Sequence, residues 1–238
     1  IKKLKIFISQ KNFFDKEKIQ INKILVDQAN FTVINNDISF YRNFFNNKFS
    51  KKKFFIKRSN IFYRKKNNEI ISILKISKAS LLYDEVNFLN KLDIKITAFK
   101  IPLNLKVNKK FLPNSTQTKI EIVSNKLKLK ILNESNQKSE DNQYIANGSN
   151  LISVFGSKLN TNYNTKKSLI MFESDTQNVK KNNTYKGKIN LNPFDFSLDI
   201  YLNRFNLIKL VNSDSLFSEF FKTKLLFNKN IKANVRVV

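Results

Sequence analysis

Residues 127–131 read Leu-Lys-Leu-Lys-Ile, so that apolar and basic side chains alternate one by one. Successive side chains of a β-strand point to opposite faces of its sheet. A strand with this sequence therefore has one apolar face and one charged face. The stretch predicts a sheet that is wet on one side and needs apolar cover on the other.

The same period of two recurs along much of the chain. Ile94, Ile96 and Ala98 alternate with polar residues, and residues 194–202 read Phe-Asp-Phe-Ser-Leu-Asp-Ile-Tyr-Leu. A pattern of this kind, repeated over several segments, predicts a mainly β protein. What covers the apolar face of its sheet is then the functional question.

Length and composition fit one all-β domain or a piece of a larger one. The chain has 238 residues, of which 41% are apolar and 23 are Phe, enough to build a core. It opens at Ile1 and closes on the alternating stretch Val235–Val238, which we interpret as a fragment of a longer protein. With only 3 Gly, we expect Asn at turn positions that need a positive φ.

The net charge of +26 is the strongest compositional signal. A basic chain of this kind favours anionic partners, either nucleic acid or phospholipid head groups. The lysines are nevertheless spread along the wet faces of the predicted strands, with small clusters at 51–53 and 64–66. We therefore interpret most of the charge as solvated strand faces and expect no nucleic acid as the main partner.

The residue types needed for most catalytic and metal sites are missing. The chain has no His and no Cys, and its 3 Gly stand apart at 148, 156 and 187. The best carboxylate pair, Asp195 and Asp199, would share a strand face about 13 Å apart, too far for a paired acid and base. We predict no catalytic residues, no cofactor, no metal site and no enzymatic activity. No apolar run approaches the length of a membrane span.

Three segments depart from the strand pattern. The spacing of Phe40, Tyr41, Phe44 and Phe45 predicts a short helix from Ser39 to Phe45. A second helix is predicted from Ser215 to Lys224, where Phe217, Phe220, Phe221 and Leu225 follow helical spacing. The polar stretch 133–150 is interpreted as a loop between strands.

The chain also carries a weak internal repeat. Ala29-Asn30-Phe31 is echoed by Ser59-Asn60-Ile61, and the segment that ends at Tyr83 is similar again. A repeat of this length favours strand units that are added side by side. We treat residues 1–238 as a single β segment.

Four stretches carry a family resemblance: Phe55–Tyr83 (FIKRSNIFYRKKNNEIISILKISKASLLY), Phe99–Leu105 (FKIPLNL), Lys126–Glu134 (KLKLKILNE) and Tyr185–Leu202 (YKGKINLNPFDFSLDIYL). They resemble the AsmA-like family of bacterial envelope proteins, which includes TamB-like members and is akin to the bridge-like lipid-transfer proteins. The resemblance runs from about Ile19 to Val238. It lies in strand patterns rather than in an invariant signature.

The resemblance implies an elongated, curved antiparallel sheet that forms an open hydrophobic groove. It further implies a periplasmic protein, anchored in the inner membrane by a segment outside this chain, with phospholipid as its partner. On this basis we expect a non-enzymatic module that shields phospholipid acyl chains between the inner and outer membranes. The residues predicted to line the groove are Leu127, Leu129, Ile131, Phe194, Phe196, Leu198 and Ile200.

Two alternatives remain open at the level of sequence. One is a basic RNA-binding or ribosome-associated protein, which would bind RNA in a strongly salt-dependent way. The other is a purely structural module in which the apolar face packs on a second sheet as a β-sandwich.

Overall fold

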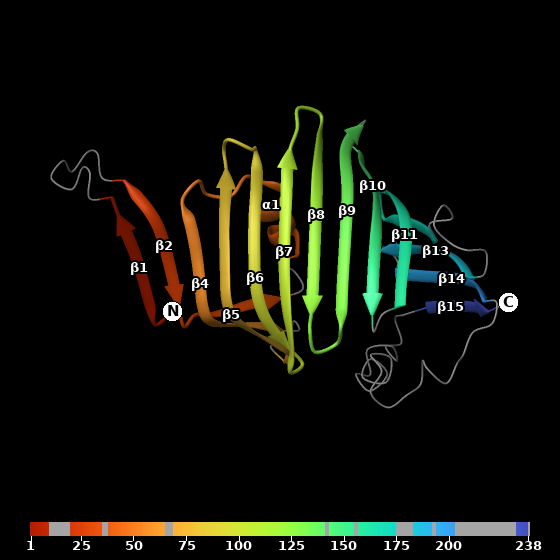
Figure 1. Ribbon diagram of the computed structural model, residues 1–238, viewed down its shortest axis with the longest axis horizontal. Coiled ribbons are helices and arrows are strands. Elements are labelled where there is room, and N and C mark those ends of the chain that lie inside the picture. Colours follow the sequence, from red (N-terminus) through yellow and green to blue (C-terminus); the bar gives the residue numbers. More distant parts are fainter. Residues whose placement is uncertain are drawn as a thin grey trace. The chain divides into compact units, whose positions relative to one another are not determined.

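The computed structural model describes residues 1–9, 20–34, 38–64, 69–140, 143–154, 157–174, 183–191, 194–202 and 232–237. The described residues form fifteen strands and one helix, which confirms the predicted mainly β fold (Figure 1). The chain divides into two compact units, Ile1–Leu132 and Asn133–Val238, where the sequence predicted a single segment. The helix predicted at 215–224 lies outside the described residues.

Unit 1 is a sheet whose strands follow each other in the order β1-β2-β4-β5-β6-β7-β8, with β3 paired to β4. Most neighbours are antiparallel, but β2 and β3 both run parallel to β4. The elements are β1 (Lys3–Ile8), β2 (Ile21–Asp27), β3 (Asn30–Ile34), α1 (Ile38–Asn46), β4 (Lys53–Arg64), β5 (Ile70–Asp84), β6 (Leu89–Ala98), β7 (Ile101–Phe111) and β8 (Ser115–Ser124).

The strand register of unit 1 aligns apolar residues into two rows that cross seven strands. Residues directly opposite each other on neighbouring strands share a face of the sheet, so each row belongs to one face. The first row is Ile6, Ile24, Phe54, Leu81, Leu92, Val107 and Ile120; the second is Leu4, Val26, Ile56, Ala79, Ile94, Leu105 and Ile122. We call the face that carries these two rows the apolar face of unit 1.

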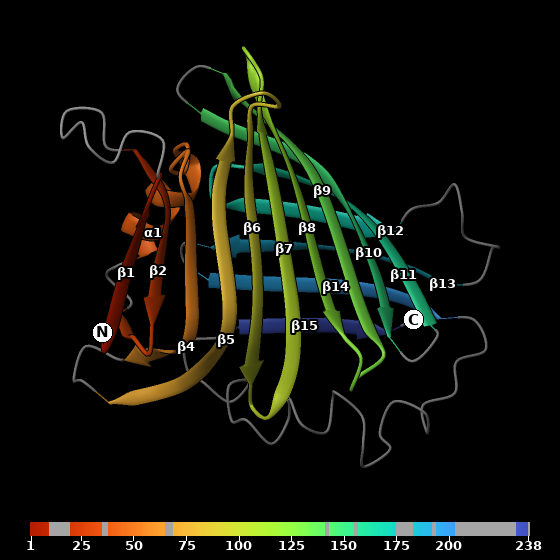
Figure 2. The same ribbon diagram turned by 60° about the vertical axis from the view of Figure 1, so that its left-hand side comes forward.

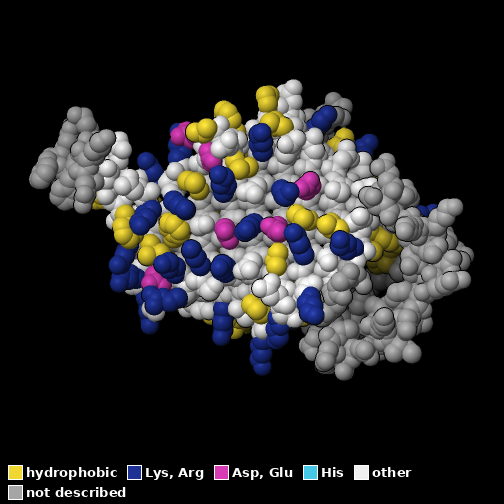
Figure 3. Space-filling view, viewed as in Figure 1, with side chains coloured by type: hydrophobic (Ala, Val, Ile, Leu, Met, Phe, Trp, Pro, Cys, Tyr) yellow, Lys and Arg dark blue, Asp and Glu magenta, His cyan; other side chains and the backbone are white. Residues whose placement is uncertain are grey.

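The opposite face of unit 1 carries charges in alternation. Asp93 lies opposite Lys106, and Lys106 lies opposite Glu121. The Glu121 carboxylate also receives Lys130 Nζ at 3.4 Å. Figure 3 shows the lysines and the interspersed acidic residues of this face in the view of Figure 1, in which α1 lies behind β6 and β7. The period of two thus keeps these charges on one face, as the sequence predicted, although the same row also carries Leu25 and Phe55.

A pair of left-handed residues lets β2 and β3 both pair with β4. Gln28 has φ 54° and Arg58 has φ 46°, and the Arg58 guanidinium pairs with the buried Asp27 carboxylate. Beyond this point Ser59 Oγ accepts a hydrogen bond from Ala29 N at 3.0 Å. Figure 2 shows β5 curving strongly at the same end of the sheet. The local kink therefore redirects three strands together.

The internal repeat has a direct structural meaning. Asn30 lies opposite Asn60 and Phe31 lies opposite Ile61 in the parallel pair β3–β4. Asn60 Nδ2 also donates to Asn30 Oδ1 at 2.9 Å. The two similar sequences are thus neighbouring strands that place like residues side by side.

Unit 2 continues the pattern with strands that follow chain order from β9 to β15. The final pair, β14–β15, is parallel, and the other pairs of described register are antiparallel. The strands are β9 (Leu129–Glu140), which runs through the boundary at residue 132, β10 (Gln143–Val154), β11 (Ser157–Lys166), β12 (Leu169–Ser174), β13 (Asn183–Leu191), β14 (Phe194–Leu202) and β15 (Lys232–Val237).

The structure corrects the expected loop at 133–150, which instead contributes most of β9 and β10. Strand ladders are built from backbone groups, and here polar side chains add to them across the strands. Asn133 Nδ2 donates to Asn150 Oδ1 at 2.8 Å and Asn164 Nδ2 donates to Asn147 Oδ1 at 2.8 Å. Cross-strand polar pairs thus replace the apolar alternation that the sequence analysis required.

The hairpin turns also differ from expectation. Among the described residues the positive φ angles outside Gly belong to Gln28, Arg58, Phe88, Phe99, Lys100, Lys128 and Lys167, and none of these is Asn. For the turns that the structure describes, the prediction that Asn would fill such positions was therefore wrong. Asn instead serves in cross-strand hydrogen bonds, where its amide can both donate and accept.

Candidate functional site

The apolar face of unit 1 is the strongest candidate site in the structure. Part of it is well packed, since Val26 on β2 and Leu92 on β6 are both 4% exposed. Its edge is open, since Leu4 and Ile6 on β1 remain more than half exposed. Within unit 1, the described residues form a single sheet layer with α1 at one end of this face. Much of the apolar surface therefore keeps partial access to solvent.

The predicted helix at 39–45 is confirmed as α1, and the residues that follow it dock on the sheet. Asn90 on β6 is 2% exposed. Its Oδ1 accepts from Phe49 N and its Nδ2 donates to the carbonyl of Asn47, both at 2.8 Å. The backbone N–H of Tyr83 donates to the carbonyl of Ser50 at 2.9 Å. This segment closes one end of the apolar face with satisfied polar groups.

Lys109 lies in the closed end, on the apolar face of β7. It is directly opposite Asn90 and two residues beyond Val107. Its Nζ donates to Asn46 Oδ1 at 2.8 Å and lies 5.8 Å from the centre of the Phe111 ring. Burial lowers the pKa of the Lys109 amine below its usual range. Across the described parts of β5 to β8, the registers place no other charged side chain on this face.

The predicted groove residues of the first set lie at the end of unit 1. Leu129 and Ile131 are half-buried in β9 and alternate with the exposed Lys128 and Lys130. Leu127 is half-buried too, but it lies in the turn before β9 rather than in the strand. The structure thus places two of the three in the predicted alternation.

The second set belongs to β14 of unit 2. Phe196 and Leu198 are half-buried, and Phe196 stacks on Phe172 of β12 with ring centres 6.3 Å apart. Phe194 and Ile200 occupy the alternate positions of the same strand, and their side chains lie outside the described set. Because the two sets fall in different units, the single continuous surface that the sequence analysis expected stays a prediction.

None of the residues in the two apolar rows was predicted to line the groove. The rows cross β1, β2 and β4 to β8, and none of these strands was predicted to contribute groove residues, although Leu103-Asn-Leu105-Lys-Val107 has the same alternation as 127–131. Lys109 was also missed. Lys109 is two residues from both Val107 and Phe111, which predicts that it shares their face of the strand. The adjacent Lys110 makes the pair look like an ordinary charged turn.

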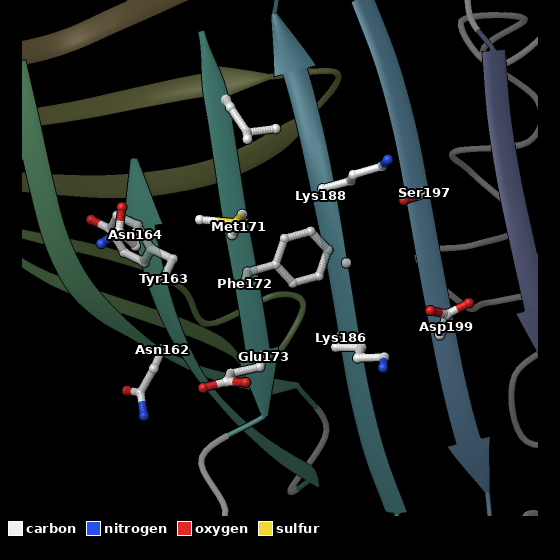
Figure 4. Close-up of a pocket in the computed structure, with 12 residues that line it drawn as sticks. Asn162, Tyr163, Asn164, Met171, Phe172, Glu173, Lys186, Lys188, Ser197 and Asp199 are labelled. Atoms are coloured by element: carbon white, nitrogen blue, oxygen red, sulfur yellow. The ribbon is translucent and has the colours of Figure 1, made fainter. Parts of the chain in front are cut away.

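Unit 2 has a shallow hollow of about 720 Å³ on the charged side of its sheet. Glu173, Lys186 and Asp199 line it from three neighbouring strands (Figure 4). The register sets Glu173 opposite Lys186 and Lys186 opposite Asp199, so that charges alternate across the strands. Asp195 lies opposite Asn190 on the same face, four residues before Asp199.

Two classes of site are absent from the part of the chain that the structure describes. No group of three or more acidic residues is placed to hold a metal ion. No described helix is long and apolar enough to cross a membrane. No family model, curated protein sequence or solved structure matches this chain.

Proposed function

We propose that this chain is a non-enzymatic lipid-binding module whose apolar sheet face shields acyl chains. The observation that carries the proposal is the pair of apolar rows that cross seven strands of unit 1 on one face. Continuous apolar surface of this kind marks a surface for lipid or another apolar partner. Each methylene that it removes from water contributes about 0.8 kcal/mol.

The resemblance to the AsmA-like family extends the proposal to the bacterial cell envelope. The cargo is then phospholipid, carried between the inner and outer membranes by a periplasmic protein. Its inner-membrane anchor would lie outside this segment. The many exposed lysines support contact with anionic head groups while the tails lie on the apolar face.

The test is native mass spectrometry of the purified protein after incubation with phosphatidylglycerol vesicles. The wild type should retain phospholipid. Leu105→Asp places a carboxylate in the second row and should abolish retention. Asn104→Asp is the matched control, because Asn104 is the exposed neighbour on the charged face and lies opposite Lys95.

Circular dichroism of the same variants separates a lipid surface from a closed core. On a lipid surface, Leu105→Asp keeps its strand signal and loses lipid. In a β-sandwich, the same change unfolds the protein because a buried carboxylate has no partner. Unfolding of this variant, together with a wild type that retains no lipid, would contradict the proposal.

A further inference from the structure

The amine of Lys109 is a buried cation that no carboxylate balances among the described residues. The residue is 9% exposed. The polar contact of its Nζ is the side-chain oxygen of Asn46, which carries no net charge. The Phe111 ring nearby offers a weak cation–π contact at 5.8 Å. A charge removed from water without an opposite charge destabilises the fold.

The amine is nevertheless close to solvent. A lysine amine has three protons to donate, and Asn46 accepts one of them. Asn46 itself is exposed, so that the amine lies one hydrogen bond from water. A second lysine, Lys48, holds its amine 5.3 Å from the centre of the Tyr83 ring, and Tyr83 packs edge-on against Phe111. At the closed end of the face, two lysine amines therefore lie near the aromatic pair Tyr83 and Phe111.

Lys109 also continues a row of apolar side chains. Leu103, Leu105 and Val107 precede it on β7 at every second residue, on the same face. From Leu103 to Lys109 the strand extends about 20 Å. The hydrocarbon half of a bilayer is about 15 Å thick, so one extended tail fits along this length.

We propose that Lys109 binds the anionic head of an amphiphile whose tail lies along β7. The inference rests on the proposed function, because it assumes that an acyl chain occupies the apolar face. It adds the head-group chemistry, a carboxylate or phosphate, and the end of the face at which the head lies. A bound anion would supply the opposite charge that no described residue offers to Lys109.

A matched pair of ligands tests the proposal on the unmodified protein. Dodecanoate and dodecanol share one tail and differ in the charge of the head, and calorimetry at submicellar concentration gives both affinities. Dodecanoate should bind about tenfold more tightly or better, as expected for a hydrogen bond to a charged group. Equal affinities overturn the head-group site and leave the lipid-binding function standing. If neither ligand binds, the proposed function itself fails.

Acetate separates an amphiphile site from a simple anion site. It carries the same carboxylate with almost no tail, so that it should bind far more weakly than dodecanoate. Acetate binding that matches dodecanoate would overturn the placement of the tail along β7.

Lys109→Met and Lys110→Met form a matched pair of variants. Lys110 is the exposed neighbour on the charged face, so its replacement removes the same bulk charge. Lys109→Met should abolish the preference for dodecanoate and keep or raise the melting temperature, because a buried charge that no described carboxylate balances is gone. Lys110→Met should keep the preference.

The rival explanation is that Lys109 serves as a contact for the end of α1, where positive charge is favourable. It predicts the opposite result: Lys109→Met lowers the melting temperature and leaves the preference for dodecanoate unchanged. That outcome would overturn the proposal. The comparison of dodecanoate with dodecanol on the wild type stands even if Lys109→Met fails to fold.

Discussion

Individual side chains fix the ends of the hairpins. Asp84 ends β5, and its carboxylate accepts hydrogen bonds from Asn87 N at 3.2 Å, Asn87 Nδ2 at 2.9 Å and Lys91 Nζ at 2.7 Å. The Lys91 and Asn87 hydrogen bonds lower the pKa of Asp84 to about 2 from a usual value of 3.8. A carboxyl group with a depressed pKa stabilises the folded state above its unfolded pKa and loses that effect as pH falls toward 2.

The Asp84 contribution predicts a pH-dependent effect of Asp84→Asn. The variant should melt below the wild type at pH 6, and the gap should close between about pH 4 and pH 2. Asp93→Asn is the control, because Asp93 is an exposed strand residue on the next strand. Thermal melts across this range measure both. A gap that stays constant down to pH 2 would show that the carboxylate charge is not responsible.

Two glycines of unit 2 are needed for close approach rather than for turns. A Cβ at Gly187 would lie 2.5 Å from Phe172 Cζ and 2.5 Å from the carbonyl oxygen of Ser197. A Cβ at Gly148 would likewise lie 2.5 Å from Tyr163 Cζ. Each ring therefore lies across the strand over a glycine that is directly opposite it.

Gly187→Ala should destabilise unit 2 by about 1–3 kcal/mol, the usual cost of overpacking. Urea denaturation gives the free energy of unfolding. The double variant Gly187→Ala/Phe172→Ala should cost less than the sum of the two single changes, because the ring is the main obstacle. Additive effects would mean that the Ser197 carbonyl, not the ring, sets the cost.

At the scale of elements, one hairpin turn holds two non-glycine residues in the left-handed region, where glycine is favoured. The β6–β7 turn passes through Phe99 and Lys100, both left-handed, with φ 49° and 64°. Non-glycine residues in this region cost of order 1 kcal/mol each. Phe99 is 65% exposed, so that its ring contributes little packing.

Phe99→Asn/Lys100→Gly should raise the free energy of unfolding by about 1–2 kcal/mol, since Asn-Gly is the favoured pair for such a two-residue turn. Lys106→Gly, in the middle of β7, is the control and should destabilise instead. Thermal denaturation measures both. If the double variant is no more stable than the wild type, the left-handed conformation of Phe99 and Lys100 does not lower the stability of the fold.

The strands were predictable where apolar and polar residues alternate, as at 93–98 and 194–202, because periodicity is a local property. The strands at 133–150 were not, because cross-strand amides rather than apolar alternation stabilise them. Parallel pairing of β2 and β3 with β4 was also beyond reach, since it depends on the left-handed Gln28 and Arg58. The apolar rows and the place of Lys109 on the apolar face could not be predicted, because they depend on the pairing register between strands. The sequence of a single strand does not contain that register.

At the scale of the whole molecule, two features compete for partners. One is the apolar face of unit 1, which is partly open to solvent. The other is a net charge of +26, largely from exposed lysines. The two respond differently to salt, because dissolved ions screen exposed charges and leave hydrophobic burial nearly unchanged.

We therefore expect binding of RNA to be weak and salt-dependent and binding of acyl chains to be persistent. A fluorescent single-stranded RNA that contacts 6 to 10 lysines should lose about two and a half to four orders of magnitude in affinity between 50 and 200 mM salt. Retention of phospholipid should change little over the same range, and Leu105→Asp should abolish it without altering RNA affinity. The opposite result, an RNA complex that survives 200 mM salt beside a protein that never retains lipid, would favour the RNA-binding alternative.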